Sequence, residues 1–377
     1  MKHSLVYMFT ACCLSMLMFS SLESRAANTL GDVDDNGSVE ITDAITLINY
    51  VLDIISCDVT PLPHPVDSAS LKVLSLGNSF AFFSTKYLTD LATAAGIPSS
   101  LYRIRVLHPQ GRSLQQWASE IEANGTVSLM TDIGTAPVHG AGGNNIRNIL
   151  NNDWDVIVLQ QNSDNASNYS TYEPYLSEIV DAIHEYCPNR DVLIAWHMIW
   201  SKPGKNWSDI KNATYHVSQN ENIDFIIPVG TAIENARYTD VWTGVDGGLM
   251  NDNNGHLAPG VGQYVSSCAW FQALLAPYFG KTIVGNTAVR TQEQVDAEWN
   301  ALSNKTHPDS KIAVTEENRT LCQYCAAVAC TNVWSLTTKL DSSVVINMGN
   351  ADVNQDGFVN ITDVCVLIND LLNNLEA

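Results

Sequence analysis

The sequence predicts an α/β domain in which a parallel sheet is covered by helices on both faces. Short apolar runs rich in Val, Ile and Leu alternate with longer stretches of helical periodicity, as expected for strands that are buried on both faces. The chain has 377 residues, 45% of them hydrophobic, which is enough for one sizeable core and a small accessory module.

Predicted strands and helices alternate along the central part of the chain. The predicted strands are Leu71–Leu76, Leu101–Leu107, Trp154–Gln160, Val192–Trp196 and Ile223–Pro228. The predicted helices are Thr85–Ala95, Leu114–Ala123, Tyr172–Tyr186, Ile210–Gln219 and Gly262–Ala276. In such a sheet the chemistry lies where the carboxyl ends of strands meet the amino ends of helices, so the residues that follow each strand are the first candidates for a site.

The chain is strongly acidic, with 40 Asp and Glu residues against 19 Lys and Arg and a formal net charge of −21. Such a surface repels phosphate backbones, which argues against a nucleic-acid partner. Part of the acidity lies in two short clusters of Asp and Asn, and these indicate bound cations instead.

The first residues, 1–26, have the pattern of an export signal peptide. Lys2 supplies a positive charge, Leu5–Phe19 is apolar, and Ser24–Ala26 offers small residues for cleavage. A membrane anchor and a lipoprotein signal at Cys12–Cys13 are alternatives that we favour less, since the apolar run is short. We therefore expect a secreted or cell-surface protein with no membrane span once the signal is removed.

The cysteines do not have the pattern of a disulfide framework. Removal of the signal takes two of the nine cysteines and leaves an odd number. Cys322, Cys325 and Cys330 lie in an Ala-rich helical stretch. A zinc site there would need a fourth ligand, and no nearby His supplies one. We expect these three side chains to be buried structural thiols.

Two copies of a calcium-loop pattern, Asp32–Asp43 and Asp352–Asp363, stand near the two ends of the chain. Calcium prefers hard oxygen ligands, and loops of this kind place them at positions 1, 3, 5, 7, 9 and 12, with Gly at position 6. The pattern predicts two structural calcium sites and no organic cofactor. The predicted ligands are Asp32, Asp34, Asn36, the carbonyl of Ser38, Glu40 and Asp43, and Asp352, Asn354, Asp356, the carbonyl of Phe358, Asn360 and Asp363.

Both loops resemble dockerin type I repeats, because position 12 is Asp and an Ile-Thr-Asp start leads into a Leu-Ile-Asn helix. Dockerin repeats normally stand in tandem and dock onto cohesins. Here the repeats, 31–55 and 350–375, are separated by a Pro-rich linker, 56–70, and a central domain, 71–340. Since neither repeat alone has enough core to fold, we expect the two to pair into one small helical, EF-hand-like module split between the termini. Its role would be to bind a cohesin-type scaffold protein or to act as a structural clasp.

A serine and a histidine are placed for nucleophilic catalysis. The first predicted strand leads into Gly77-Asn-Ser-Phe80, which puts the Ser79 hydroxyl at the mouth of the sheet beside a helix start. A serine nucleophile needs a base, and His256 lies in a loop before a late helix, with acidic residues just upstream. Taken alone, Ser79 fits equally well as a helix N-cap, and His256 as an ordinary loop histidine.

These residues give the chain a resemblance to the SGNH (GDSL-type) hydrolase superfamily, and within it to a branch whose first block is Gly-Asn-Ser-Phe. That branch also has a Trp-Asp-Val-Ile-Val-Leu-Gln-Gln strand, here Trp154–Gln161, and an Ile-Pro-Val-Gly-Thr-Ala-Ile segment, here Ile227–Ile233. The resemblance runs from Leu71 to Tyr278 and onward toward Leu336. It implies a three-layer α/β/α, flavodoxin-like fold with a Ser-His(-Asp) site.

The resemblance also implies a role for each block. Ser79 would be the nucleophile, with its own N–H as the first oxyanion donor and the N–H of Gly111 as the second. The third donor is an Asn side chain in the superfamily. Here Gln161 would take its place, with Asn162 and Gln160 as alternatives.

The block that carries the histidine departs from the superfamily pattern. The superfamily has Asp three residues before the His, where this chain has Asn253, whereas Asp252 stands four residues before it. We favour Asp252 as the orienting acid; a Ser-His dyad helped by Asn253 or a backbone carbonyl is the alternative. His197 and Trp200, at the end of the fourth predicted strand, are expected to line the cleft.

The expected activity is that of a secreted carboxylic ester hydrolase that removes acyl groups, above all acetyl, from a polysaccharide or oligosaccharide. The carbohydrate preference is inferred from the dockerin-like repeats and the export signal that accompany the domain. It is not inferred from the chemistry of the site residues. The rival hypotheses are a lipase or thioesterase on the same fold, a non-catalytic carbohydrate-binding or scaffold protein, and an enzyme that transfers the acyl group to a sugar.

Overall fold

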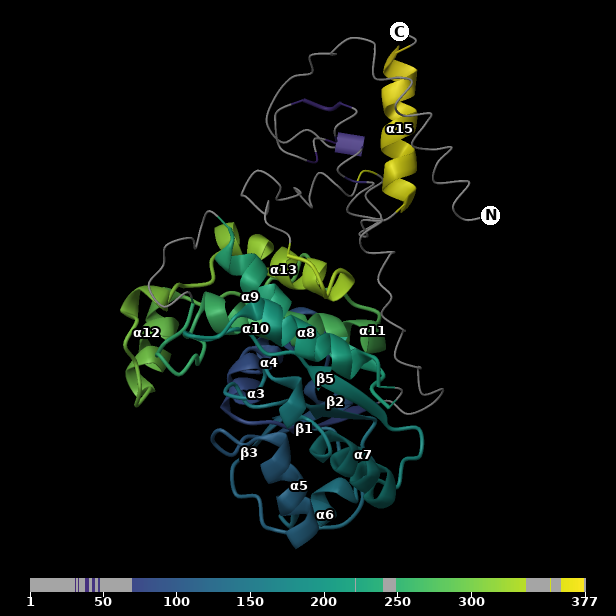
Figure 1. Cartoon of the computed structure of the whole chain (residues 1–377). Helices are drawn as coiled ribbons and strands as arrows, with labels where there is room; N and C mark the ends of the chain where they lie inside the picture. The colour runs from purple at the N-terminus through teal and green to yellow at the C-terminus, as the bar shows by residue number, and fades with distance from the viewer. Residues whose placement is uncertain are drawn as a thin grey trace. The chain divides into compact units, whose positions relative to one another are not determined.

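The computed structural model divides the chain into two compact units, one of residues 53–345 and one made from the two ends, 1–52 and 346–377 (Figure 1). The structure describes residues 70–220, 222–239, 249–336 and 361–375, together with 31, 33, 38–40, 43, 44, 47 and 353. The predicted signal peptide, 1–26, and the predicted linker, 56–70, therefore lie outside the described residues, except for Ser70.

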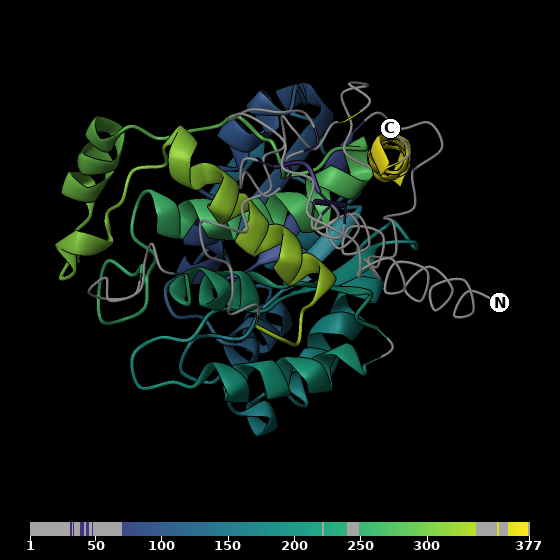
Figure 2. The same ribbon diagram turned by 90° about the horizontal axis from the view of Figure 1, so that it is seen from above.

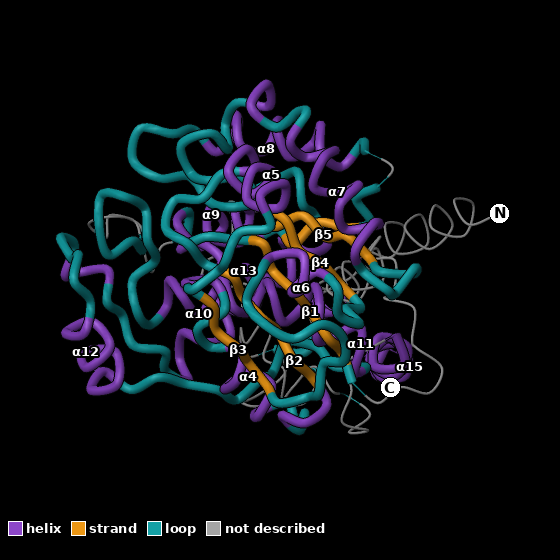
Figure 3. Tube along the Cα trace, turned by 90° about the horizontal axis from the view of Figure 1, so that it is seen from below, coloured by secondary structure: helices purple, strands orange, loops and turns teal. Residues whose placement is uncertain are grey.

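A six-stranded sheet in the order β3-β2-β1-β4-β5-β6 forms the centre of the larger unit (Figure 3). The strands are β1 (Leu71–Leu76), β2 (Tyr102–Leu107), β3 (Met130–Gly134), β4 (Val156–Leu159), β5 (Leu193–His197) and β6 (Phe225–Ile227). Five run parallel, and β3 pairs antiparallel with β2. The parallel strands, counted alone, stand in the order 2-1-3-4-5, so the direction of winding reverses between β1 and β4. A ligand crevice forms at such a switch point, outside the carboxyl ends of the strands.

The five predicted strands are confirmed, each ending within two residues of its predicted bounds. The sequence does not predict β3, because this edge strand buries only Ile133 and has no apolar run. Charge pairing holds it instead: the Asp132 carboxylate accepts hydrogen bonds from Arg103 and Arg105 of β2. Patterns of hydrophobicity carry no signal for such a strand.

Helices cover both faces of the sheet, as predicted. Figure 1 shows α5, α6 and α7 on one side and α4, α9, α10 and α13 on the other. The helices of this unit are α3 (Ser79–Ser84), α4 (Leu88–Ala94), α5 (Leu114–Ala123), α6 (Ile146–Leu150), α7 (Tyr175–Tyr186), α8 (Trp207–Ser218), α9 (Val229–Arg237), α10 (Val261–Trp270), α11 (Ala276–Phe279), α12 (Gln292–Ala301) and α13 (Glu316–Thr331). Of the helices that the structure describes, none combines the length and the apolar character needed to cross a bilayer.

One predicted helix is interrupted, and helix α9 forms where no helix is predicted. The predicted helix Gly262–Ala276 is present as α10 and the start of α11, joined by a π-helical turn at Phe271–Leu275. Helix α9 is not predicted, because it contains Gly230, a poor helix former. The glycine is needed for close packing: a Cβ atom there would lie 2.4 Å from the carbonyl oxygen of Ile199.

Four cysteines lie where α13 crosses α9 and α10 (Figure 2). They are Cys268 of α10 and Cys322, Cys325 and Cys330 of α13, and all are buried. Burial raises the pKa of the Cys268, Cys322 and Cys325 thiols well above the ordinary value. These three therefore stay protonated and unreactive. The predicted burial of the α13 cysteines is confirmed.

The smaller unit brings the two ends of the chain together. It contains α15 (Ile361–Leu375), whose Leu367 is buried and lies against Gly31 from the other end of the sequence. Gly31 has a φ of +96°, and a side chain at this position would press on Leu367. Residues more than 300 positions apart thus share one small core.

Eight of the twelve predicted calcium ligands lie outside the described residues. Asp32, Asp34, Asn36, Asp352, Asn354, Asp356, Phe358 and Asn360 lie outside the described residues, and Ser38, Glu40, Asp43 and Asp363 lie within them. Asp43 is buried, and its carboxylate accepts hydrogen bonds from the N–H groups of Val33 (2.6 Å) and Glu40 (2.7 Å). The side chain of Asp43, the last residue of the first predicted loop, thus contacts the backbone near the start of that loop.

Candidate active site

Ser79 is held at the carboxyl end of β1 by the turn that starts α3. The N–H of Gly77 donates to the carbonyl of Leu107 at the end of β2 (3.0 Å). The N-cap of α3 is Asn78, whose side chain accepts from the N–H of Phe80. The alternative in which Ser79 is merely the N-cap is therefore wrong, and its hydroxyl is left for other partners.

The hydroxyl of Ser79 meets a histidine that is itself held by a carboxylate. Ser79 Oγ lies 2.9 Å from His256 Nε2, and His256 Nδ1 lies 2.8 Å from Asp252 Oδ2. Ser79 and His256 are half-buried, whereas Asp252 is only 3% exposed. This is the order of groups that activates a serine: nucleophile, base and orienting acid, joined by hydrogen bonds.

The loop from Met250 to Leu257 explains how an acid four residues before the histidine can reach it. The two ends of the loop pair as an antiparallel bridge, and Gly255 turns the chain with a φ of +90°. Asp252 Oδ1 accepts from the N–H of Asn254 (3.0 Å) and of His256 (3.1 Å), which leaves Oδ2 for the imidazole. Although burial acts to raise the pKa of Asp252, these hydrogen bonds and the nearby imidazole prevail and lower it.

Asn253, three residues before His256, points elsewhere: its Oδ1 lies 2.9 Å from Nε2 of His307. Of the two candidates for the orienting acid, the structure brings Asp252 to the imidazole and turns Asn253 away from it.

The loops after β2 and β4 meet beside Ser79. The side chain of Asn78 donates to the carbonyl of Arg112 (3.1 Å), and the side chain of Asn162 donates to the carbonyl of Gly111 (2.9 Å). Gly111 is exposed and has a φ of +61°. The Gly111 turn is thus fixed on one side by the residue before Ser79 and on the other by the loop after β4.

Gln161 does not point at the site. Its Nε2 donates to the carbonyl of Thr171 (3.2 Å), and its Oε1 accepts from the N–H groups of Leu114 (3.1 Å) and Asn162 (2.9 Å). Gln160 is buried, and its Oε1 lies 2.8 Å from His197 Nδ1, away from the Gly111 turn. Of the three candidates in this loop, only Asn162 has its amide beside Gly111.

His197 and Trp200 do not line a cleft, which corrects the prediction. His197 is 1% exposed, and burial lowers its pKa to about 3, so it is neutral. Trp200 is fully buried, stacks on Phe80 with ring centroids 4.4 Å apart, and donates to the carbonyl of Gly255 (2.8 Å). Trp200 thus supports the histidine loop from beneath.

Sequence reasoning missed the aromatic side chains around the imidazole. Phe83 lies 5.0 Å from the His256 ring, centroid to centroid, and Phe82 stacks on His108 at 4.5 Å. The sequence signal for these contacts is the aromatic run Phe80–Phe83 directly after Ser79. In a helix, residues two positions apart point to nearly opposite sides, so these rings surround the start of α3.

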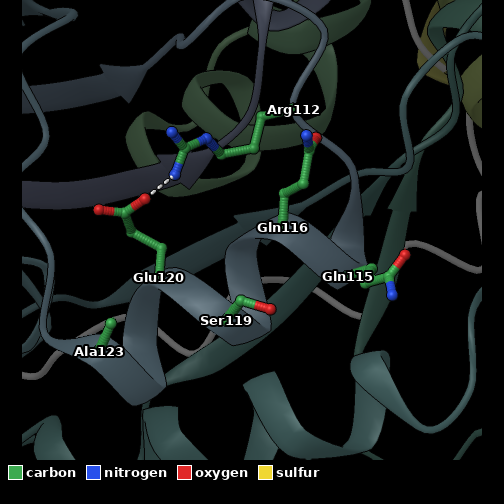
Figure 4. Close-up of a pocket in the computed structure, with 6 residues that line it drawn as sticks. All are labelled: Arg112, Gln115, Gln116, Ser119, Glu120 and Ala123. Atoms are coloured by element: carbon green, nitrogen blue, oxygen red, sulfur yellow. Dashed lines mark hydrogen bonds and ion pairs between the residues drawn. The ribbon is translucent and has the colours of Figure 1, made fainter.

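A hollow of about 420 Å³ lies along α5, next to Arg112, the residue after Gly111 (Figure 4). Its lining residues are Arg112, Gln115, Gln116, Ser119, Glu120 and Ala123. Arg112 forms an ion pair with Glu120, so the lining is polar but offers no net charge.

The fold and the site define an α/β protein with a hydrogen-bonded Ser-His-Asp group at the switch point of a mostly parallel sheet. Residues 72–303 match the domain of unknown function DUF4886, and because this is more than half of the sequence, the chain belongs to the DUF4886 family. Residues 328–372 match the dockerin type I domain. Dockerin type I domains bind calcium and cohesins, and they occur in extracellular proteins.

A crystal structure of a DUF4886 family protein from Bacteroides uniformis has a similar fold, with a TM-score of 0.53 and 23% sequence identity. The similarity covers 72% of this chain and 98% of the other. No curated protein matches the sequence. The solved relative supports the fold of the central unit.

Proposed function

We propose that this protein is an extracellular serine esterase of the SGNH type, which removes acyl groups, above all acetyl, from a polysaccharide. The observation that carries the proposal is the pair of hydrogen bonds that link Ser79 to His256 and His256 to Asp252 at the carboxyl edge of the sheet. The flavodoxin-like order of the five parallel strands supports it, because that order creates a crevice at this edge.

The reaction would proceed through an acyl-enzyme. Ser79 Oγ attacks the ester carbonyl carbon while His256 Nε2 accepts the hydroxyl proton, and Asp252 stabilises the imidazolium that forms. His256 then gives the proton to the leaving alcohol oxygen as the ester C–O bond breaks. A water molecule repeats the sequence on the acyl-enzyme, releases the carboxylic acid and returns the proton to Ser79.

The oxyanion of each tetrahedral intermediate needs hydrogen-bond donors. Candidates are the N–H groups of Ser79 and Gly111 and the side-chain amide of Asn162, which stands beside Gly111. We assign the third donor to Asn162 in place of Gln161, because the Gln161 amide faces both the carbonyl and the hydroxyl of Thr171, whereas the Asn162 amide has one bond, to the Gly111 turn. Donors fixed in advance act most strongly, since no reorganisation is needed during the reaction.

Asn162 and Gln161 are expected to fail in different ways when each is replaced by Ala. Asn162→Ala should lower kcat for an aryl acetate by roughly 10²- to 10³-fold, the usual cost of one oxyanion donor. Gln161→Ala should cost about 2–4 kcal/mol of stability, because the buried N–H of Leu114 and the half-buried N–H of Asn162 lose their acceptor. Kinetics and denaturant unfolding of both variants check this; the reverse pattern would return the donor role to Gln161.

The esterase proposal is tested by acetate release from acetylated xylan and from an aryl acetate by the purified full-length protein. A fluorophosphonate gives a second readout, with one label expected per chain, on the peptide that contains Ser79. Hydrolysis of long-chain esters or thioesters alone would favour a lipase or thioesterase. Neither hydrolysis nor labelling would leave a carbohydrate-binding or scaffold protein as the better hypothesis, and acyl transfer to an added sugar would show as ester formation.

The carbohydrate substrate is proposed from the dockerin match, because dockerins attach enzymes to cohesin-bearing scaffolds outside the cell.

We further propose that the two calcium loops form one module. The match covers 328–372, whereas the first loop lies near the other end, and the contact of Gly31 with Leu367 supports their pairing.

Calcium removal is expected to destabilise the smaller unit. At calcium concentrations 100 to 1,000 times the Kd, binding stabilises a folded unit by about 3–4 kcal/mol, so EDTA should lower its melting temperature by several degrees. If the loops pair, Asp43→Asn and Asp363→Asn should each weaken binding at both sites in calorimetric titration. Loss of one site with the other unchanged would mean that the loops fold independently.

A further inference from the structure

A second hollow adjoins the loop that carries Asp252 and His256. It has a volume of about 440 Å³, and its lining includes Lys202, Lys205, Arg237, Asn253 and His307, which we call the basic hollow. Among the described residues that line it, none is acidic.

The basic hollow keeps a positive charge in a strongly acidic chain. Lys202 is paired with Asp164, whose side chain is 74% exposed, and Arg237 is paired with the buried Glu234. The ammonium group of Lys205 donates to the backbone carbonyl of Asp164 (2.7 Å). Among the described residues, the three cationic side chains of the hollow are matched by these two carboxylates, an excess of one positive charge, in a molecule whose net charge is −21.

The hollow is built onto the same loop as the base. A Cβ atom on Gly255 would lie 2.5 Å from the Cβ of Lys202, and the next residue is His256, in contact with Ser79. Asn253 of this loop is part of the lining. A group bound in the basic hollow would therefore lie against the loop that carries the imidazole.

The position of the hollow decides which part of an ester can reach it. The carbonyl oxygen must face the donors at Gly111 and Asn162, whereas the leaving alcohol must face His256, because the imidazole gives it a proton. Since the basic hollow shares its wall with the His256 loop, it lies on the side of the leaving alcohol.

We propose that the basic hollow binds an anionic group, a carboxylate or a sulfate, on the alcohol part of the ester. This rests on the proposed esterase function and deepens it: the substrate is an acylated sugar chain that bears acidic units. Asp164 competes with the substrate anion for Lys202. The hollow on the α5 side contrasts with it, since its amides, hydroxyl and paired Arg112 suit neutral sugar hydroxyls.

The test compares esters that differ only in charge. The probes are 4-acetoxybenzoate and 4-acetoxybenzenesulfonate, each measured against its neutral amide, 4-acetoxybenzamide or 4-acetoxybenzenesulfonamide, with the full-length protein. The readout is the ratio of kcat/KM for the anionic over the neutral ester. Comparing this ratio between proteins cancels the intrinsic reactivity of the leaving groups.

Two variants should move the ratio in opposite directions. Lys202→Gln/Lys205→Gln should lower it about three- to tenfold, and Asp164→Asn should raise it by a similar factor. Asp164 is an exposed side chain, so its variant tests the proposal even if the double variant folds poorly. Lys281→Gln, at an exposed position on another surface, is the matched control and should leave the ratio unchanged.

Salt and the acyl side give two further checks. In the wild type, 1 M NaCl should bring the ratio close to that of the double variant. The monoester of 4-nitrophenol with succinic acid, whose charge is on the acyl side, should respond equally little to all three variants.

A ratio that is the same in the wild type and both charge variants, with the neutral esters still hydrolysed, would overturn the basic hollow and leave the esterase standing. A response to only one of the two anions would support the hollow and identify the anion. If neither neutral ester is hydrolysed, the esterase proposal fails, and the basic hollow fails with it.

Discussion

Ser79→Ala is expected to lower kcat/KM for an aryl acetate by about 10⁴- to 10⁶-fold, because the nucleophile is lost and only binding and the oxyanion donors remain. Stability should hardly change, since the hydroxyl is half-buried and the N-cap of α3 is the neighbouring Asn78. Steady-state kinetics and a thermal melt of the same preparation check both statements.

Ser84 offers a matched control within the same helix. It also lies near a histidine, with its Oγ 3.4 Å from His197 Nε2, but both side chains are buried and His197 is neutral. Ser84→Ala should keep kcat/KM within a few-fold and cost about 1–2 kcal/mol, the value of its hydrogen bond to the carbonyl of Phe80. Equal losses in the two variants would mean that the Ser79 effect is structural.

Asp252→Asn should lower kcat roughly 10⁴-fold while leaving the shape of the site intact. The amide keeps an oxygen for the N–H groups of Asn254 and His256, but it cannot hold the imidazole in the correct tautomer or stabilise its charged form. Asn253→Ala is the control, because its side chain contacts His307 and not His256, and a neutral ester should be hydrolysed at nearly the wild-type rate.

The pH dependence of stability gives a second readout for Asp252. Its pKa is lower in the folded protein than in the unfolded chain, so its carboxylate stabilises the fold above the ordinary aspartate pKa. That contribution is lost as the pH falls through the folded-state pKa. Asp252→Asn should remove this part of the acid destabilisation, and urea unfolding from about pH 5 down to about pH 2 measures it; an identical pH profile in the variant would contradict the argument.

Much of the central fold could be predicted, because its parallel strands are apolar throughout and stand next to clear helical patterns. Two of the elements that escaped prediction, β3 and α9, make contacts that sequence periodicity does not record. Strand β3 depends on the pairing of Asp132 with two arginines of β2, and α9 depends on the closeness of Gly230 to the Ile199 carbonyl. Both contacts exist only after distant segments have met.

The site was predictable where one residue type has one chemical use. Ser79 and His256 could be named from their places after a strand and before a helix. The choice between Asp252 and Asn253 depended on the turn at Gly255, and the choice between Gln161 and Asn162 depended on Thr171, which takes the glutamine amide. When similar side chains are neighbours in sequence, their roles can be told apart only by the partners that the fold brings to each of them.

The edges of the sheet have a consequence for the protein at high local concentration. Unpaired strand edges invite another chain to add to the sheet, and proteins avoid this with short or charged edge strands. One edge here is β3, which places Asp132 and two arginines at the border, and the other is β6, which is only three residues long. Copies crowded together should therefore remain separate particles instead of joining edge to edge into aggregates.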